Sequence, residues 1–267
     1  MDSVEIALGG KSFRMQLTLV IPVFNEESNI GPLIIEAFDV VSQASLGEII
    51  VVDDGSDDGT GPEIKALLIK YRTLRYIRHH SRSGQSASIR TGVVAAQFPI
   101  VGTMDGDGQN DPAEIASLVE RLGQLGGEPA MVAGLRKGRK GPGSRKIASR
   151  LANWIRDKVL SDDCPDTGCG LKIYWRDAYL ELPYFNTMHR FLPALFLTYG
   201  HRIAYREVSD RPRLRGKSKY TNFGRALIGL YDLVGVSWLR KRSVLGLVTE
   251  DSSRSPQMAK ERQVSMD

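Results

Sequence analysis

Short apolar runs alternate with amphipathic segments through the first half of the chain, and this alternation limits the fold more than any other feature. The apolar runs are rich in β-branched residues and end in turn-forming residues, which is typical of buried strands. They cover residues 17–22, 48–53, 75–78, 100–104 and 131–134. The segments between them carry apolar residues at helical spacing, as in the helix expected after Asn25, which that residue is predicted to cap. Strands alternating with helices predict an α/β fold, with a mostly parallel sheet flanked by helices on both faces.

The second half is predicted to contain a basic amphipathic helix, two strands and an apolar helix. These cover 144–160, 171–175, 203–208 and 188–199. We expect a flexible leader over 1–14, one large domain over 15–222, an amphipathic helical region over 223–249 and a disordered tail over 250–267. Residues 223–242 combine apolar side chains with a tryptophan and a basic end, which favours a helix lying in a membrane interface, packed on the core, or docked on a membrane protein.

Acidic or polar turns follow residues 22, 52 and 104, each directly after a predicted strand. The carboxyl ends of parallel strands meet at one edge of a sheet, where ligands bind. In the third turn, Asp105 and Asp107 offer hard oxygen ligands to Mg²⁺ or Mn²⁺, and Gln109 adds a neutral carbonyl oxygen. Glycines at 106 and 108 let the backbone bend close to a ligand, and Pro112 is expected to start the next helix.

Positive charge is concentrated in the second half. The net charge is +5, but the stretches 136–150 and 211–219 are rich in arginine and lysine and contain no acid. Such blocks attract the phosphates of nucleotides, lipid head groups or nucleic acid.

Neither the cysteines nor the hydropathy points to an exported or membrane-spanning protein. Cys164 and Cys169 are too few for a zinc site without a nearby histidine, so we expect free thiols in a reducing compartment. No stretch reaches the roughly 20 apolar residues that a transmembrane helix needs. The start of the chain carries Asp2 and Glu5 and lacks an apolar signal core. A cytoplasmic protein without a transmembrane helix is expected.

The strand-end motifs together resemble the GT-A glycosyltransferases of family 2. The matching segments are 21–26 (IPVFNE), 52–60 (VDDGSDDGT) and 105–107 (DGD). Within that family the chain is most similar to the dolichol-phosphate mannose synthase branch, which glycosylates polyprenyl phosphates. That similarity lies in 107–112, 134–136 and 211–220, and 188–193 is similar to bacterial members. Many relatives carry C-terminal transmembrane helices that this chain lacks, so membrane contact is expected to be peripheral or through a partner protein.

The resemblance implies a Rossmann-like GT-A domain with a basic acceptor-side extension. It implies an inverting, metal-dependent transfer of a sugar from a nucleotide-sugar to a polyprenyl phosphate at the cytoplasmic membrane face. The implied nucleotide-binding residues are Pro22, Asn25, Glu26, Asp53, Asp54 and Asp105. Asp107 and Gln109 are the implied ligands of Mg²⁺ or Mn²⁺, and Asp105, Asp107 and Arg136 are the implied catalytic residues. The implied acceptor-phosphate binders are Arg136, Arg145, Arg211, Arg213, Ser218 and Lys219.

The acceptor determines whether a catalytic base is needed. A phosphomonoester is largely a dianion at pH 7 and attacks without a base. A hydroxyl of a lipopolysaccharide or polysaccharide needs one, and Asp166 is the candidate in that case. His189 is a candidate proton carrier or a capping and packing residue.

Two rival classes remain. A nucleic-acid-binding module is disfavoured, because the acidic turns gather where its ligand would sit. A nucleotidyltransferase would share the sheet and the metal but release pyrophosphate. The sequence does not distinguish GDP from UDP donors, nor mannose, glucose, a uronic acid or an amino-arabinose, although bacterial relatives favour a uronic acid such as galacturonate.

Overall fold

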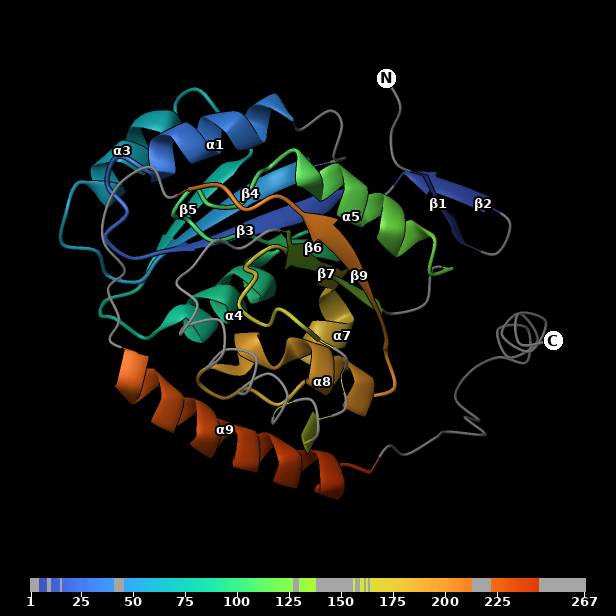
Figure 1. The fold of residues 1–267 in the computed structure, drawn as a ribbon. Helices are drawn as coiled ribbons and strands as arrows, with labels where there is room; N and C mark the ends of the chain where they lie inside the picture. The colour runs from blue at the N-terminus through green and yellow to red at the C-terminus, as the bar shows by residue number, and fades with distance from the viewer. Residues whose placement is uncertain are drawn as a thin grey trace, which may run out of the picture.

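A single seven-stranded sheet forms the centre of the molecule (Figure 1). The computed structural model describes residues 5–8, 11–14, 16–40, 46–126, 130–137, 156, 159–160, 162, 164–212 and 222–244. The strand order is β5-β4-β3-β6-β8-β7-β9, and β8 runs antiparallel to both of its neighbours while the other pairs are parallel. The strands are β3 (Leu17–Val23), β4 (Leu46–Asp53), β5 (Leu74–Arg78), β6 (Ile100–Thr103), β7 (Ala130–Arg136), β8 (Lys172–Trp175) and β9 (Arg202–Val208). The predicted mostly parallel α/β sheet is confirmed.

Helices cover both faces of this sheet (Figure 1). One face carries α1 (Ile30–Asp39), α3 (Thr60–Leu67) and α5 (Glu114–Gly123). The other carries α4 (Gln85–Ala95), α7 (Arg176–Leu180), the 3₁₀ helix η1 (Met188–Arg190) and α8 (Leu192–Thr198). The long helix α9 (Asn222–Arg242) lies outside α8 and η1. Among the residues that the structure describes, no helix combines the length and apolar composition needed to cross a bilayer.

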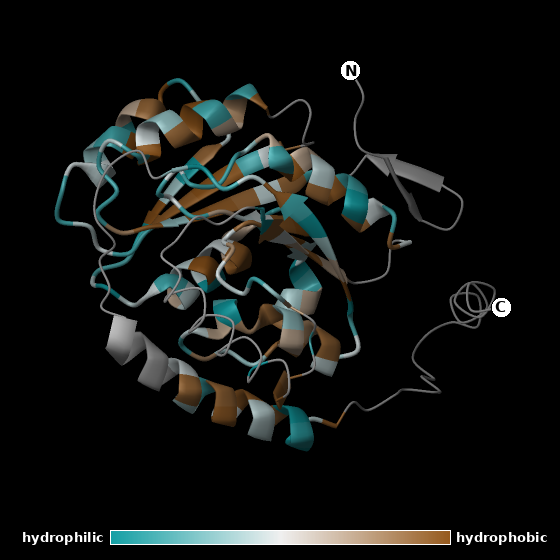
Figure 2. Ribbon diagram, in the orientation of Figure 1, coloured by the Kyte–Doolittle hydropathy of each residue, from teal (hydrophilic) through white to brown (hydrophobic). Residues whose placement is uncertain are grey.

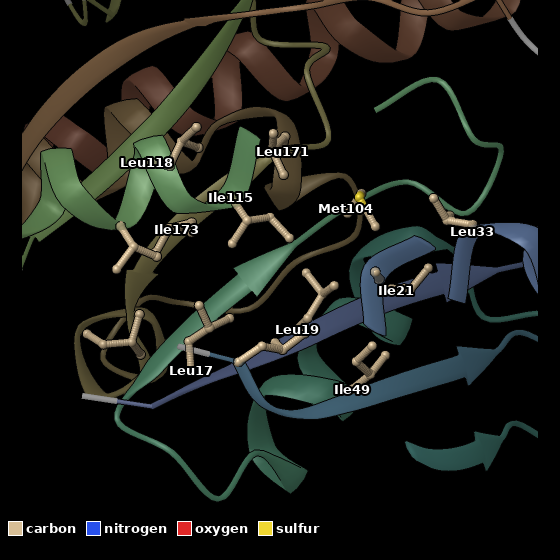
Figure 3. Close-up of a cluster of buried hydrophobic side chains, with 14 of the residues drawn as sticks. Leu17, Leu19, Ile21, Leu33, Ile49, Met104, Ile115, Leu118, Leu171 and Ile173 are labelled. Carbon is tan, nitrogen blue, oxygen red and sulfur yellow. The ribbon is translucent and has the colours of Figure 1, made fainter. Parts of the chain in front are cut away.

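The central strands are mostly apolar because both of their faces are buried. Along β3, Leu17, Leu19 and Ile21 point into the core beneath α1 and α5 (Figure 3). Val20 belongs to the second core cluster, with Ile89 and Val93 of α4. Hydrophobic residues therefore follow the strands and the inner sides of the helices (Figure 2). Cys164 and Cys169 are both buried and free, as predicted, and burial raises the pKa of each thiol.

The N-terminal part of the chain differs in local structure from what was expected. Within the expected leader, β1 (Glu5–Leu8) and β2 (Lys11–Arg14) pair as an antiparallel hairpin, whereas the leader's boundary stays a prediction. Asn25 does not cap the first helix, which begins at Ile30. The N-cap residue of α1 is Asn29, whose side chain makes no capping bond. The carboxylate of Glu63 on α3 instead accepts the backbone N–H groups of Ser28 at 2.9 Å and Gly31 at 3.2 Å.

The second half follows the expected elements with two adjustments. The apolar helix expected over 188–199 is divided into η1 and α8, which begins with a proline in its first turn. The strand expected over 203–208 is β9, and the helix expected over 223–242 is α9. Most of the basic helix expected over 144–160, and the whole tail over 250–267, lie outside the described residues. The proposed domain boundaries stay a prediction.

Candidate functional site

The turns after β3, β4 and β6 meet at one edge of the sheet, as the sequence predicted. Val23 at the end of β3 pairs with Asp53 at the end of β4, and Val20 pairs with Thr103 at the end of β6. The backbone N–H of Asp54 donates to the carbonyl of Val23 at 2.8 Å, which holds the first two turns together.

Asp53 is fully buried and shapes the turn that follows it. The hydroxyl of Tyr76 donates to Oδ2 at 2.6 Å, and the backbone N–H of Ser56 donates to Oδ1 at 2.8 Å. Nη1 of Arg78 lies 3.8 Å from Oδ2. Burial, together with the hydrogen bond and charge of Asp53, raises the pKa of Tyr76 to about 12. Sequence reasoning missed Tyr76, which is one residue of an edge strand with no local motif.

Asp54 anchors the loop that leads into α4. Its Oδ1 accepts the backbone N–H of Ser83 at 2.8 Å and contacts Nδ1 of His79 at 2.9 Å, while Oδ2 accepts the N–H of Gly84 at 2.7 Å. Gly84 has φ of 95°, a conformation that favours glycine. Asp54 therefore fixes the shape of this edge of the site through the main chain of 83–84.

Asn25 and Glu26 join the first turn to the second. The amide of Asn25 donates to Oδ1 of Asp57 at 2.6 Å and accepts the N–H of that residue at 3.0 Å. The N–H of Glu26 donates to Oγ1 of Thr60 at 2.8 Å. Pro22 lies half-buried at the end of β3. The predicted nucleotide-binding residues before Asp105 thus lie together in the turns after β3 and β4.

A cation–π contact joins the first turn to the loop before α4 and was not predicted. The guanidinium of Arg82 lies over the ring of Phe24, with 4.4 Å between its central carbon and the ring centroid. Phe24 belongs to the first motif and Arg82 to the loop held by Asp54, so the contact forms only once the fold has brought them together.

The turn after β6 places Asp105 and Asp107 side by side in a crowded position. Nε2 of Gln85, at the start of α4, donates to Oδ1 of Asp105 at 2.8 Å. Between the two aspartates, a Cβ at Gly106 would lie 2.5 Å from Cγ1 of Val23, so only glycine fits there. Gly108 has φ of 75°, and Oδ1 of Asp107 accepts the N–H of Gln109 at 3.1 Å.

The electrostatics of this turn favour a bound cation. Burial, followed by repulsion from Asp107, raises the pKa of Asp105 to about 6, although Lys172, Arg136 and Gln85 act in the opposite direction. A divalent cation beside the two carboxylates would remove that repulsion. Within the described ranges, no three histidine, cysteine, aspartate or glutamate side chains cluster as a closed cation site would require. Mg²⁺ is commonly held by one or two carboxylates together with substrate phosphates, and Asp107 with Gln109 fits that pattern.

Arg136, at the end of β7, is clamped by Asp166. Its Nε donates to Oδ2 at 2.7 Å and its Nη2 donates to Oδ1 at 2.8 Å, a bidentate pair. Burial disfavours the charge on Arg136, but the hydrogen bonds and charge of Asp166 outweigh this and raise its pKa above the ordinary value. Both oxygens of Asp166, the candidate base, are therefore engaged by the guanidinium.

Lys172 and Gly170 complete the wall behind Asp105, and sequence reasoning missed both. Lys172 is only 4% exposed, and its ammonium donates to the carbonyl of Cys169. A Cβ at Gly170 would lie 2.3 to 2.5 Å from the carboxyl atoms of Asp105. A lysine within an apolar strand was the available signal, since an isolated buried charge needs a partner.

Of the remaining predicted residues, the structure describes His189 and Arg211 but not the other four. His189 packs against the start of α4, where its Nδ1 lies 2.7 Å from Oγ of Ser86. Arg211 lies between two carboxylates, with Nη1 at 2.6 Å from Glu36 and Nη2 at 2.6 Å from Asp111. The predicted phosphate binders Arg145, Arg213, Ser218 and Lys219 lie outside the described residues.

Comparison with known proteins identifies the family to which the chain belongs. Residues 18–183 match the family model for glycosyl transferase family 2. The dodecaprenyl-phosphate galacturonate synthase of Rhizobium johnstonii is 35% identical over 232 residues, which cover 85% of this chain and 68% of the relative. The undecaprenyl-phosphate 4-deoxy-4-formamido-L-arabinose transferase of Aeromonas hydrophila subsp. hydrophila is 32% identical over 237 residues, covering 87% of this chain and 72% of that protein.

Solved structures share the fold. Glucosyl-3-phosphoglycerate synthase from Mycobacterium tuberculosis, in complex with Mn²⁺, UDP and phosphoglyceric acid, aligns with a TM-score of 0.64 at 19% identity, covering 87% of this chain and 80% of that one. Its complex with Mg²⁺ and UDP aligns with a TM-score of 0.62 at 20% identity, covering 85% and 79%. The predicted resemblance is confirmed: the chain is a GT-A glycosyltransferase and belongs to glycosyl transferase family 2.

Proposed function

We propose that this glycosyltransferase moves a sugar from a nucleotide-sugar to a polyprenyl phosphate, with inversion at the sugar C1. The relatives are named for transfer to dodecaprenyl or undecaprenyl phosphate. The observation that carries the proposal is the engagement of Asp166, whose two oxygens both accept hydrogen bonds from Arg136. A site whose candidate base is held in an ion pair suits an acceptor that is already ionised.

In the proposed reaction, a phosphate oxygen of the acceptor attacks C1 of the sugar in line. The bond between C1 and the diphosphate breaks, and its electron pair leaves with the nucleoside diphosphate. Mg²⁺ or Mn²⁺ held by Asp107 and Gln109 would neutralise charge on that leaving group. Gln85 and Gly170 fix the position of Asp105 beside the donor.

Arg136 is proposed to orient the acceptor phosphate. Asp166 engages its Nε and Nη2, and among the described residues Nη1 has no partner, so this nitrogen can meet a phosphate oxygen. Holding two phosphates close together requires cations to offset their repulsion. The basic residues at 213–219 would supply the rest of that charge.

Helix α9 is proposed to contact the membrane surface on the cytoplasmic side. Its inner face is packed: Leu233 and Val236 are buried, and Asp232 accepts the hydroxyl of Thr187 at 2.6 Å. Its outer face exposes apolar side chains at helical spacing, followed by two exposed cations. These residues are Leu230, Tyr231, Val234, Trp238, Lys241 and Arg242. Such a face suits the boundary between anionic head groups and acyl chains. A membrane protein docked on the same face is the second candidate.

The acceptor proposal is tested by offering two lipids that differ only in the phosphate. The full chain is incubated with undecaprenyl phosphate or undecaprenol, each with a panel of UDP- and GDP-sugars that includes UDP-galacturonate. We expect glycosylation of the phosphate alone, abolished in Asp107→Ala and retained in part by Asp166→Asn. Equal use of the alcohol, with complete loss in Asp166→Asn, would instead support a hydroxyl acceptor with Asp166 as base.

The membrane proposal is tested by flotation with vesicles that contain an anionic lipid. We expect Trp238→Ser combined with Val234→Ser to lower the floated fraction. Ile69→Ser is the matched control, because Ile69 is also apolar and 91% exposed but lies beyond the end of α3. Equal flotation of the wild type and the α9 variant would point to a partner protein.

A further inference from the structure

The segment after β9 is fastened to the turn that carries the proposed metal ligands. The backbone N–H of Arg211 donates to the carbonyl of Gln109 at 3.0 Å, and Nε2 of Gln109 donates to the carbonyl of Arg211 at 3.4 Å. These residues are 102 positions apart in the sequence. The Gln109 side of the metal turn is therefore held by the last described segment before the proposed acceptor-binding residues.

The side chain of Arg211 extends this link to a third element. Nη1 lies 2.6 Å from Oε1 of Glu36 on α1, and Nη2 lies 2.6 Å from Oδ2 of Asp111. The other oxygen of Asp111 accepts the N–H of Ala113 at 2.9 Å, just before α5. The two carboxylates raise the pKa of Arg211 against the opposing effect of burial. Both terminal nitrogens of the guanidinium thus contact acidic groups, in a place where a phosphate would meet negative charge.

The turn itself needs such support. Gly108, between the proposed ligands Asp107 and Gln109, has φ of 75°, and it lines a small hollow of about 190 Å³ together with Leu33, Glu36 and Arg211. Gly108 gives the backbone of the turn conformational freedom, and the hollow leaves space into which the turn can move. The Asp107 side follows β6 directly, and the amide oxygen of Asn110 ties the far side back to the N–H of Asp105 at 3.3 Å. Arg211 adds the link from the Gln109 side to the segment after β9.

We propose that Arg211 is a positioning residue that couples the metal turn to the acceptor-binding segment, rather than a phosphate ligand. This inference rests on the proposed function. The proposed acceptor-binding residues follow Arg211 in the chain, beginning at residue 213. Loss of the link should therefore weaken metal binding and acceptor binding at once.

The direction in which Glu36→Gln changes lipid binding distinguishes a phosphate ligand from a positioning residue at Arg211. If Arg211 bound the acceptor phosphate, removing the competing carboxylate in Glu36→Gln would strengthen lipid binding. If Arg211 is a positioning residue, Glu36→Gln weakens the link and acts in the same direction as Arg211→Met. Glu36 is 41% exposed, so its substitution is a mild change for the fold.

The experiment measures Mn²⁺ binding to the enzyme–UDP complex by titration calorimetry, and the KM for undecaprenyl phosphate and for the nucleotide-sugar. Partly exposed ion pairs contribute up to about 1 kcal/mol each, so we expect Arg211→Met to weaken Mn²⁺ binding and raise the lipid KM by about five- to ten-fold. Glu36→Gln should weaken Mn²⁺ binding and raise the lipid KM by about three-fold. The double variant should show no larger effect than Arg211→Met alone. Arg211→Lys should lie between, since one ammonium cannot bridge both carboxylates as a fork does.

Arg121→Met is the matched control, because Arg121 lies in the last turn of α5, at the end of the helix remote from the metal turn, and its Nη1 donates to Oε1 of Gln124 at 3.0 Å. This variant should leave the Mn²⁺ affinity and the lipid KM unchanged. Unchanged Mn²⁺ affinity in Arg211→Met, or a lower lipid KM in Glu36→Gln, would overturn the inference. If Arg211→Met fails to fold by circular dichroism, Glu36→Gln carries the test. Absence of Mn²⁺–UDP binding in the wild type would contradict the proposed function itself.

Discussion

Replacing Asp105 by asparagine should stabilise the metal-free protein at neutral pH. Burial and the neighbouring Asp107 raise the pKa of Asp105 from 3.8 to about 6. Because the folded state holds the proton more tightly than the unfolded chain, ionisation of Asp105 costs stability. That cost is absent below the unfolded pKa, grows as the pH rises and is complete above the folded pKa.

The magnitude follows from the difference between the two pKa values. Each pH unit corresponds to about 1.4 kcal/mol, so the full cost is roughly 3 kcal/mol at pH 7.5, and local relaxation should reduce the gain to about 1–2 kcal/mol. For a chain of this size that corresponds to about 3–6 °C in Tm. Asparagine keeps a carbonyl oxygen that can still accept the hydrogen bond from Gln85.

The assay is thermal unfolding in EDTA at pH 5.0 and pH 7.5. We expect the gain in Asp105→Asn at pH 5.0 to be about half of that at pH 7.5. Adding Mn²⁺ and UDP should reverse the order, because only the wild type gains the full electrostatic benefit of the cation. Asp177→Asn is the control, since the carboxyl side chain of Asp177 is 87% exposed and should show no gain. A lower Tm for Asp105→Asn at pH 7.5, or an equal gain at both pH values, would refute the reasoning.

Three further substitutions test other parts of the site. Gly170→Ala should lower kcat more than ten-fold and also lower Tm, because its Cβ would come within 2.5 Å of the Asp105 carboxylate; unaltered kcat would contradict the packing argument. Asp54→Ala should cost about 2–4 kcal/mol in urea unfolding, since the N–H groups of Ser83 and Gly84 lose their acceptor; a loss below 0.5 kcal/mol would show that water replaces it. Lys219→Ala should raise the lipid KM far more than the nucleotide-sugar KM; equal effects would contradict its role at the acceptor.

The sequence was sufficient to predict the sheet and the edge at which its acidic turns meet. Strands such as β3 and β4 are apolar runs that end in polar turns, and in a parallel sheet such turns must meet. Asp105 and Asp107 were found for the same reason, because an Asp-x-Asp at a strand end is a local pattern. Helix α9 was also predicted, although its division into a packed and an exposed face became clear only in the structure.

The sequence could not predict how these residues are held, because the contacts join segments far apart in the chain. Glu63 accepts the N–H of Gly31, in the first turn of α1, from 32 residues away, and Tyr76 donates to Asp53 from 23 residues away. Arg211 lies in a basic stretch of sequence, and it was therefore predicted to bind phosphate. The structure instead places a carboxylate at each of its two terminal nitrogens. No local pattern encodes such partners.

The most direct test of the central claim is the structure of the lipid product. The full chain is incubated with undecaprenyl phosphate and its accepted nucleotide-sugar, and the purified product is examined by ³¹P and ¹H NMR. The account predicts a phosphodiester between C1 of the sugar and the lipid phosphate, with the anomeric configuration opposite to that of the donor and one free nucleoside diphosphate per product. A sugar attached to a hydroxyl, a retained configuration or release of pyrophosphate would contradict it.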